Sequence, residues 1–245
     1  MTFTVNPGEY LLSNSAWQPD DTRRFADRGC DAVYLSFDSA VGRSLDLAFL
    51  RDLPGLERVS IVGPMRDDSA VFEVPQLRGL RLLTGSKKPL AVERTPLLDA
   101  LVVGERPGLE GIEVLTRLET LIVDPFRGSD LTFLAAASAL RSFRVDGRYG
   151  ALALRGIEGA PGLRQLELID VNVASLEALP ALPALRVLVV PNVRMTDPLS
   201  LEPIAELVEL EDLRVGPVRS VTPLAALSKL RRVNVSAVAD DTCAR

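Results

Sequence analysis

A short apolar pattern recurs along this chain at a nearly fixed interval. Asp46–Ile61 (DLAFLRDLPGLERVSI) places leucines three residues apart and then changes to an alternation of apolar and polar residues. Its apolar-x-x-apolar-x-apolar end occurs in nine copies, 20 to 25 residues apart, which begin at Leu56, Leu77, Leu98, Leu118, Leu140, Leu163, Leu185, Leu210 and Leu230. Spacing by three or four is typical of helical turns, and alternation is typical of strands. We therefore expect a stack of similar strand-and-turn units.

The pattern resembles the leucine-rich repeats of about 22 residues in SDS22-like and internalin-like arrays, over residues 30–236. This resemblance implies an α/β fold, a curved right-handed horseshoe-shaped solenoid. Parallel strands would line its concave face, and short helices or 3₁₀ turns would cover its convex face.

One feature of the family is missing. Its asparagine ladder is replaced by Pro64, Arg106, Phe126, Arg148, Val171, Val193 and Val218. We expect the turns to satisfy their backbone groups through neighbouring backbone or water.

The ends of the chain do not carry the repeat. Residues 19–29 indicate a short helix, because Asp20 and Asp21 lie at its start and Gly29 follows its end. A stack needs a cover over its first strand, expected at Ala32–Phe37. We predict an N-terminal cap at residues 1–29, a solenoid of about ten strands at residues 30–236, and a C-terminal tail at residues 237–245. Residues 84–95, which lengthen the repeat, are interpreted as a loop.

The composition argues against catalysis. The chain has no histidine, so it lacks the commonest general base and metal ligand. No glycine-rich loop carries the Lys-Ser/Thr of a phosphate site. A calcium site at Asp124, Asp146 and Asp170 is a weak alternative, since calcium takes six or more oxygen ligands. We expect no cofactor and no metal, and an enzyme is the less favoured class.

Charge and hydropathy bound the partners and the compartment. The net charge of −5, with both signs mixed, gives no sign of nucleic-acid or membrane binding. The start of the chain has neither a basic region nor an apolar segment typical of a signal peptide. An arginine-rich, lysine-poor composition suggests a bacterial, cytoplasmic protein. Cys30 and Cys243 would lie roughly 40 Å apart along stacked strands, too far for a disulfide.

Strand alternation predicts two rows of outward residues. The middle row, between the two inward positions of each strand, is Tyr34, Ser60, Arg81, Val102, Ile122, Arg144, Glu167, Val189, Arg214 and Asn234. The leading row, one step before the first inward position, is Ala32, Arg58, Gly79, Ala100, Thr120, Ser142, Gln165, Val187, Asp212 and Arg232. Acids follow the strands, so we expect a mildly basic face with an acidic rim.

An apolar centre of Val102, Ile122, Val187 and Val189 beside arginines is typical of a protein-binding patch. The alternative is that parallel sheets favour valine and isoleucine anyway. We expect a monomeric module that binds an unknown protein as a regulator, scaffold, inhibitor or antidote. Self-association through an exposed end strand near Val235 is the second hypothesis. The predicted partner-binding residues are Tyr34, Arg58, Arg81, Val102, Ile122, Arg144, Glu167, Val189 and Arg214.

Overall fold

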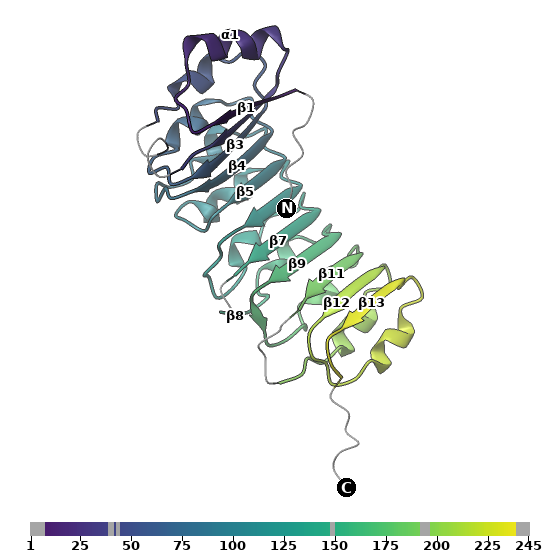
Figure 1. Ribbon diagram of the computed structural model, residues 1–245. Helices are drawn as coiled ribbons and strands as arrows, with labels where there is room; N and C mark the ends of the chain where they lie inside the picture. Colours follow the sequence, from purple (N-terminus) through teal and green to yellow (C-terminus); the bar gives the residue numbers. More distant parts are fainter. Residues whose placement is uncertain (1–7, 39–41, 43–44, 148–149, 192–196, 239–245) are drawn as a thin grey trace. The chain divides into compact units, whose positions relative to one another are not determined.

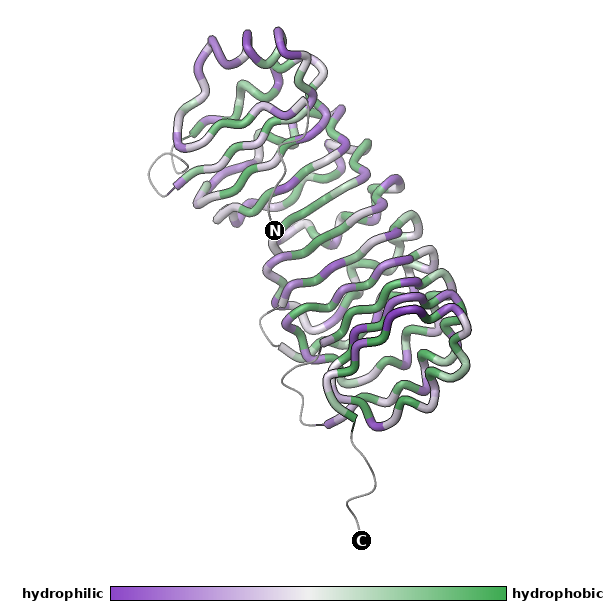
Figure 2. Tube along the Cα trace, turned by 45° about the vertical axis from the view of Figure 1, so that its right-hand side comes forward, coloured by the Kyte–Doolittle hydropathy of each residue, from purple (hydrophilic) through white to green (hydrophobic). Residues whose placement is uncertain are grey.

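Parallel strands joined by short 3₁₀ turns build the chain (Figure 1). The computed structural model describes residues 8–38, 42, 45–147, 150–191 and 197–238. These residues belong to two units, Met1–Leu118 and Glu119–Arg245. Coloured by hydropathy, the trace shows apolar residues recurring along the strands of each unit, interrupted by polar residues on some of them (Figure 2).

The first unit contains five strands that pair in parallel in chain order. They are β1 (Glu9–Ser13), β2 (Ala32–Ser36), β3 (Arg58–Gly63), β4 (Gly79–Thr84) and β5 (Ala100–Val103). Its 3₁₀ turns are η1 (Ala48–Asp52), η2 (Ser69–Glu73), η3 (Val92–Arg94) and η4 (Leu109–Val114). The short turn η3 lies within residues 84–95, where the sequence predicted only a loop.

The predicted cap helix is present as α1 (Pro19–Asp27). Its first turn is fixed by Asp21, whose carboxylate accepts hydrogen bonds from the Gln18 N–H (2.8 Å) and the Tyr10 hydroxyl (2.7 Å). The side chain of Phe25, in the same helix, is fully buried. The strand β1 was not predicted, because the continuous apolar run around Leu11 hides the alternation. It extends the sheet by pairing with β2.

In the described residues, the main sheet of the second unit contains six strands that pair in parallel. In spatial order they are β6 (Thr120–Val123), β7 (Ser142–Asp146), β9 (Gln165–Ile169), β11 (Val187–Val190), β12 (Asp212–Val215) and β13 (Arg232–Val235). The strands β8 (Ala151–Leu152) and β10 (Asn172–Val173) form a separate two-stranded parallel sheet. The 3₁₀ turns are η5 (Thr132–Leu134), η6 (Ile157–Gly159), η7 (Leu179–Ala181), η8 (Glu202–Glu206) and η9 (Thr222–Ala226).

The inward residues form the core as the repeat predicts. Side chains at the central inward position are fully buried in both units, including Leu101, Leu121, Phe143 and Leu166. Val233 on β13 is the exception, with 50% of its surface exposed. Cys30 is buried and has a free thiol, and Cys243 lies outside the described residues. None of the helices in the described part of the chain is long and apolar enough to cross a membrane.

The positions of the missing asparagines are filled mainly by apolar side chains. Phe126, Val171 and Val218 are at most 4% exposed. Their turns bond to neighbouring backbone as expected: the Phe126 N–H donates to the Asp146 carbonyl (2.8 Å), and the Val218 N–H to that of Ala237 (3.0 Å). Arg148 and Val193 lie outside the described residues.

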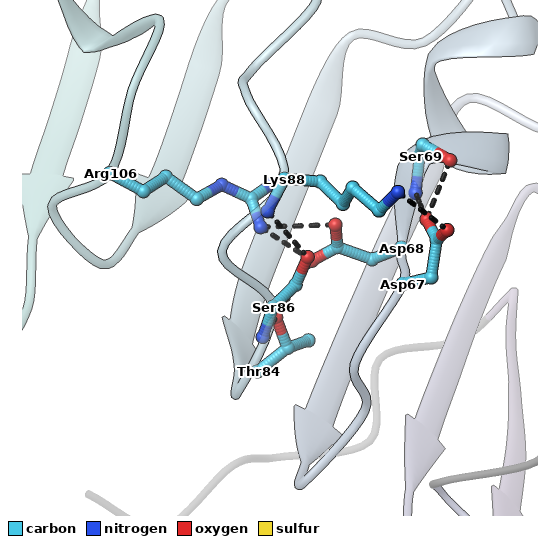
Figure 3. A network of polar contacts seen from close by, with 7 residues as sticks. All are labelled: Asp67, Asp68, Ser69, Thr84, Ser86, Lys88 and Arg106. Carbon is cyan, nitrogen blue, oxygen red and sulfur yellow. Dashed lines mark hydrogen bonds and ion pairs between the residues drawn. The ribbon is translucent and has the colours of Figure 1, made fainter.

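Arg106, at another of these positions, forms a buried ion pair in the first unit (Figure 3). Its Nη1 lies 2.8 and 3.0 Å from the two carboxylate oxygens of Asp68. The Arg106 side chain is 6% exposed and that of Asp68 is fully buried. The Thr84 hydroxyl, at the end of β4, donates to Asp68 (2.7 Å). This polar contact therefore ties together three successive repeats of the unit.

Candidate functional site

Half-buried side chains on the strands of the first unit form the middle row that the sequence predicts. Tyr34, Ser60, Arg81 and Val102 are paired in register on β2, β3, β4 and β5. Leu11 of β1 continues this row beside Tyr34 and is 51% exposed. Sequence reasoning missed Leu11 because it missed its strand.

Small residues in the leading row leave a hollow on this face. Ala32, Gly79 and Ala100 occupy three of its positions, with Arg58 between the first two. The hollow has a volume of about 230 Å³. We call it the strand-face notch. The residues that line it include Tyr34, Arg58, Ser60, Gly79, Arg81, Ala100 and Val102.

Arg58 is held in a fixed position beside the notch. Its Nη2 lies 2.8 and 3.0 Å from the two carboxylate oxygens of Asp31. The side-chain stem lies close to Gly79, where an added Cβ would come within 3.1 Å of the Arg58 Cγ. A larger residue at position 79 would therefore fill the space and press on this stem.

The middle row of the second unit carries both charged and apolar residues, in the order that the sequence predicts. Ile122, Arg144, Glu167, Val189 and Arg214 are paired in register. The Arg144–Glu167 ion pair (3.3 Å) lies between Ile122 and Val189, so these two apolar residues are not neighbours across the sheet.

The face arginines of this unit are paired with acids, so the expected basic surface is largely neutralised. Arg144 also lies 2.8 Å from Asp146. Burial raises the pKa of Asp146, helped by the charges of Asp124 and Asp170, while the hydrogen bond and charge of Arg144 act in the opposite direction. The acids at this rim thus interact with one another.

Asp212 was predicted to be an outward acid, but it is only 3% exposed. Arg232 on the next strand (3.0 Å) and Arg214 on its own strand (3.4 Å) form ion pairs with it. Arg214 remains exposed. Two long side chains over one short carboxylate explain the burial of Asp212.

The described residues contain no group of three or more His, Cys, Asp or Glu side chains placed to hold a metal ion. The calcium alternative at Asp124, Asp146 and Asp170 therefore gains no support. What the faces present is a set of polar and apolar groups fixed on strands, an arrangement suited to recognition of a surface.

Comparison with known proteins gives structural matches only. No family model matches this sequence, and no curated protein matches it. The internalin InlF from Listeria monocytogenes is similar in structure with a TM-score of 0.72 and 15% identity, over 94% of this chain and 67% of that one. The functional domain of InlJ from the same organism is similar with a TM-score of 0.60 and 15% identity, over 94% of this chain and 53% of that one.

A leucine-rich-repeat protein from Leptospira interrogans gives a TM-score of 0.59 and 12% identity, over 91% of this chain and 64% of that one. The chain thus spans between about half and two thirds of the length of these three proteins. At such low identities, the similarity concerns the fold: a parallel sheet with 3₁₀ turns between its strands.

Proposed function

We propose that this chain, which has the fold of leucine-rich-repeat proteins, binds a partner protein through the face of its parallel strands. The observation that carries the proposal is the row Tyr34, Ser60, Arg81 and Val102, which lies around a notch in a sheet of rigid register. Aromatic and arginine side chains beside a pocket are the usual anchors of protein interfaces. Side chains already fixed on strands lose little freedom on binding.

The proposed contact residues divide between the units. Tyr34, Arg58, Arg81 and Val102 lie on the first unit, and Ile122, Arg144, Glu167, Val189 and Arg214 on the second. We propose a non-enzymatic role as a regulator, scaffold or inhibitor, performed by a monomer in the cytoplasm of a bacterium. Binding by fixed side chains needs no cofactor.

Charge substitutions on the face test this function, with affinity capture from the native cytosol as the assay. We expect Val102→Glu to weaken capture of a specific partner, since it places a charge in the row. Val114→Glu is the matched control, because Val114 is 47% exposed on η4, away from the strands.

In the second unit, Val189→Glu is the corresponding test variant on the strand face. Val208→Glu is its control, since Val208 is 56% exposed and lies outside any strand. If all four variants keep the fold and capture the same protein equally well, binding does not use the strand face.

Self-association is the second candidate, and the exposure of Val233 favours it. Among the described residues, β13 pairs with β12 alone, which leaves its other edge open. An open strand edge beside apolar surface can pair with another copy. Light scattering over a range of concentrations tests it: this candidate predicts a mass that rises with concentration and a Val233→Lys variant that stays monomeric. If the protein has the mass of a monomer at every concentration, self-association is excluded.

A further inference from the structure

We propose that the strand-face notch takes one aromatic side chain with a hydrogen-bonding tip, a tyrosine or a tryptophan, from the partner protein. This inference rests on the proposed function and adds the chemistry of the contact. Four properties of the notch support it: its size, its lining, a buried hydroxyl and its charge balance.

The notch has room for one large side chain and a mostly apolar lining. Its volume is about 230 Å³, which corresponds to roughly eight water molecules at about 30 Å³ each. The side chains of Val102 and Ala100, the Gly79 backbone and the aliphatic stem of Arg58 offer carbon surface. Removing this surface from water favours an apolar group, and an aromatic ring covers the most surface with the fewest rotatable bonds.

The Ser60 hydroxyl lies in the lining of the notch. Its Oγ is buried and has no hydrogen-bond partner among the described residues. Ser60 lies in the middle of the notch, between Tyr34 and Arg81 in register. A buried hydroxyl without a bond costs free energy, so a ligand that bonds to it is preferred over one that does not. The tyrosine hydroxyl and the tryptophan N–H can each form this bond, whereas phenylalanine cannot.

The charges around the notch favour a neutral ring over an acidic side chain. Arg58 and Arg81 are balanced by Glu9, which lines the notch, and by Asp31, which holds Arg58. An anion would therefore meet no net positive charge. A guanidinium within about 6 Å of a ring face still adds a favourable cation–π contact.

The described notch lies on the first unit, where small residues stand in the leading row at Ala32, Gly79 and Ala100. In the second unit, Thr120 and Ser142 on β6 and β7 are also small, whereas the corresponding positions on β9, β11 and β12 hold Gln165, Val187 and Asp212. We therefore assign the aromatic anchor to the first unit.

Titration of the full-length protein with N-acetyl-tyrosinamide, N-acetyl-tryptophanamide and N-acetyl-phenylalaninamide tests the inference, with amide NMR shifts as the readout. We expect the first two probes to shift amides of β2 to β5. We expect them to bind roughly two- to tenfold more tightly than the phenylalanine probe, the range of one hydrogen bond. Ser60→Ala should remove that preference while leaving weak binding of all three.

Gly79→Leu should abolish binding of every probe by filling the notch. Thr120→Leu, the same substitution in the leading row of the second unit, is the matched control and should leave the affinities unchanged. Circular dichroism of each variant checks that the fold is retained.

Equal affinity for all three probes, or no shift at β2 to β5, would overturn the inference. So would binding that appears only after Phe3→Ala, because the notch would then belong to the chain's own N-terminal segment. If a partner is captured equally well by Gly79→Leu, the inference fails while the proposed function stands. If the probes bind as expected but no partner is captured, the proposed function fails.

Discussion

Removing the guanidinium of Arg106 should destabilise the first unit far more than removing an exposed one. Arg106→Leu keeps the apolar stem but leaves Asp68, which is fully buried, with the Thr84 hydroxyl as its only side-chain donor among the described residues. Breaking a buried ion pair by removing one partner costs about 3–5 kcal/mol. For a chain of this length, each kcal/mol of lost unfolding free energy lowers the thermal unfolding midpoint by about 2–4 °C. We therefore expect this midpoint to fall by roughly 6–20 °C.

Two companion variants separate this effect from general damage. Arg51→Leu breaks an ion pair with Glu73 (2.8 Å) in which the Arg51 side chain is 52% exposed and the Glu73 side chain 40%. Because this pair is exposed, its loss should lower the free energy of unfolding by at most about 1 kcal/mol. Adding Asp68→Asn to Arg106→Leu should recover most of the loss, because the amide carries no charge and still accepts from Thr84.

Thermal unfolding and urea unfolding, each followed by circular dichroism, measure all three variants. The slope with urea shows whether the same surface unfolds in each of them. If Arg106→Leu is no less stable than Arg51→Leu, or if the double variant is the weakest, the buried charge is not the cause.

Two other outcomes follow from particular residues of the second unit. The Asp130 carboxylate accepts hydrogen bonds from Thr132 and from Arg155, which lower its pKa to about 2. Its folded pKa lies below the unfolded value near 3.9. Its contribution to stability is thus present above that value and is lost as the pH falls through about 2. Carboxyl NMR titration measures this, and a midpoint near 4 contradicts it. Leu121→Asp should cost more than about 4 kcal/mol and unfold its unit, because it buries an unpaired charge. Ile122→Asp, one residue on but outward, should keep the circular dichroism spectrum of the parent; equal loss in both would refute the inward assignment.

The period of the apolar residues was enough to predict the strands and the core. Leu101 and Leu121 are buried because strand alternation leaves them no other side of the sheet. The strand β1 was missed because it lies outside the repeat and its run of Tyr10, Leu11 and Leu12 shows no alternation. The strand β11 is just as apolar, but it was predicted because the repeat includes it.

The site was predicted less completely because it depends on contacts across strands. The strand-face notch requires Gly79 and Ala100 to be neighbours, which they become only when β4 pairs with β5. Three small residues in the leading row were the available signal. The burial of Asp212 depends on how far the Arg232 side chain reaches from the next strand, and the alternation of a single strand does not predict this.

The alternation on β3 separates two kinds of evolutionary constraint. Val59 and Ile61 are at most 2% exposed, while Ser60 between them lines the strand-face notch. Selection for a stable core would thus act on odd-numbered positions of this strand and, under the proposed function, selection for binding on an even-numbered one. A lineage could exchange Ser60 or Gly79 and acquire a different partner while its core remained intact. Divergence should therefore be fastest at the positions that determine what the protein recognises.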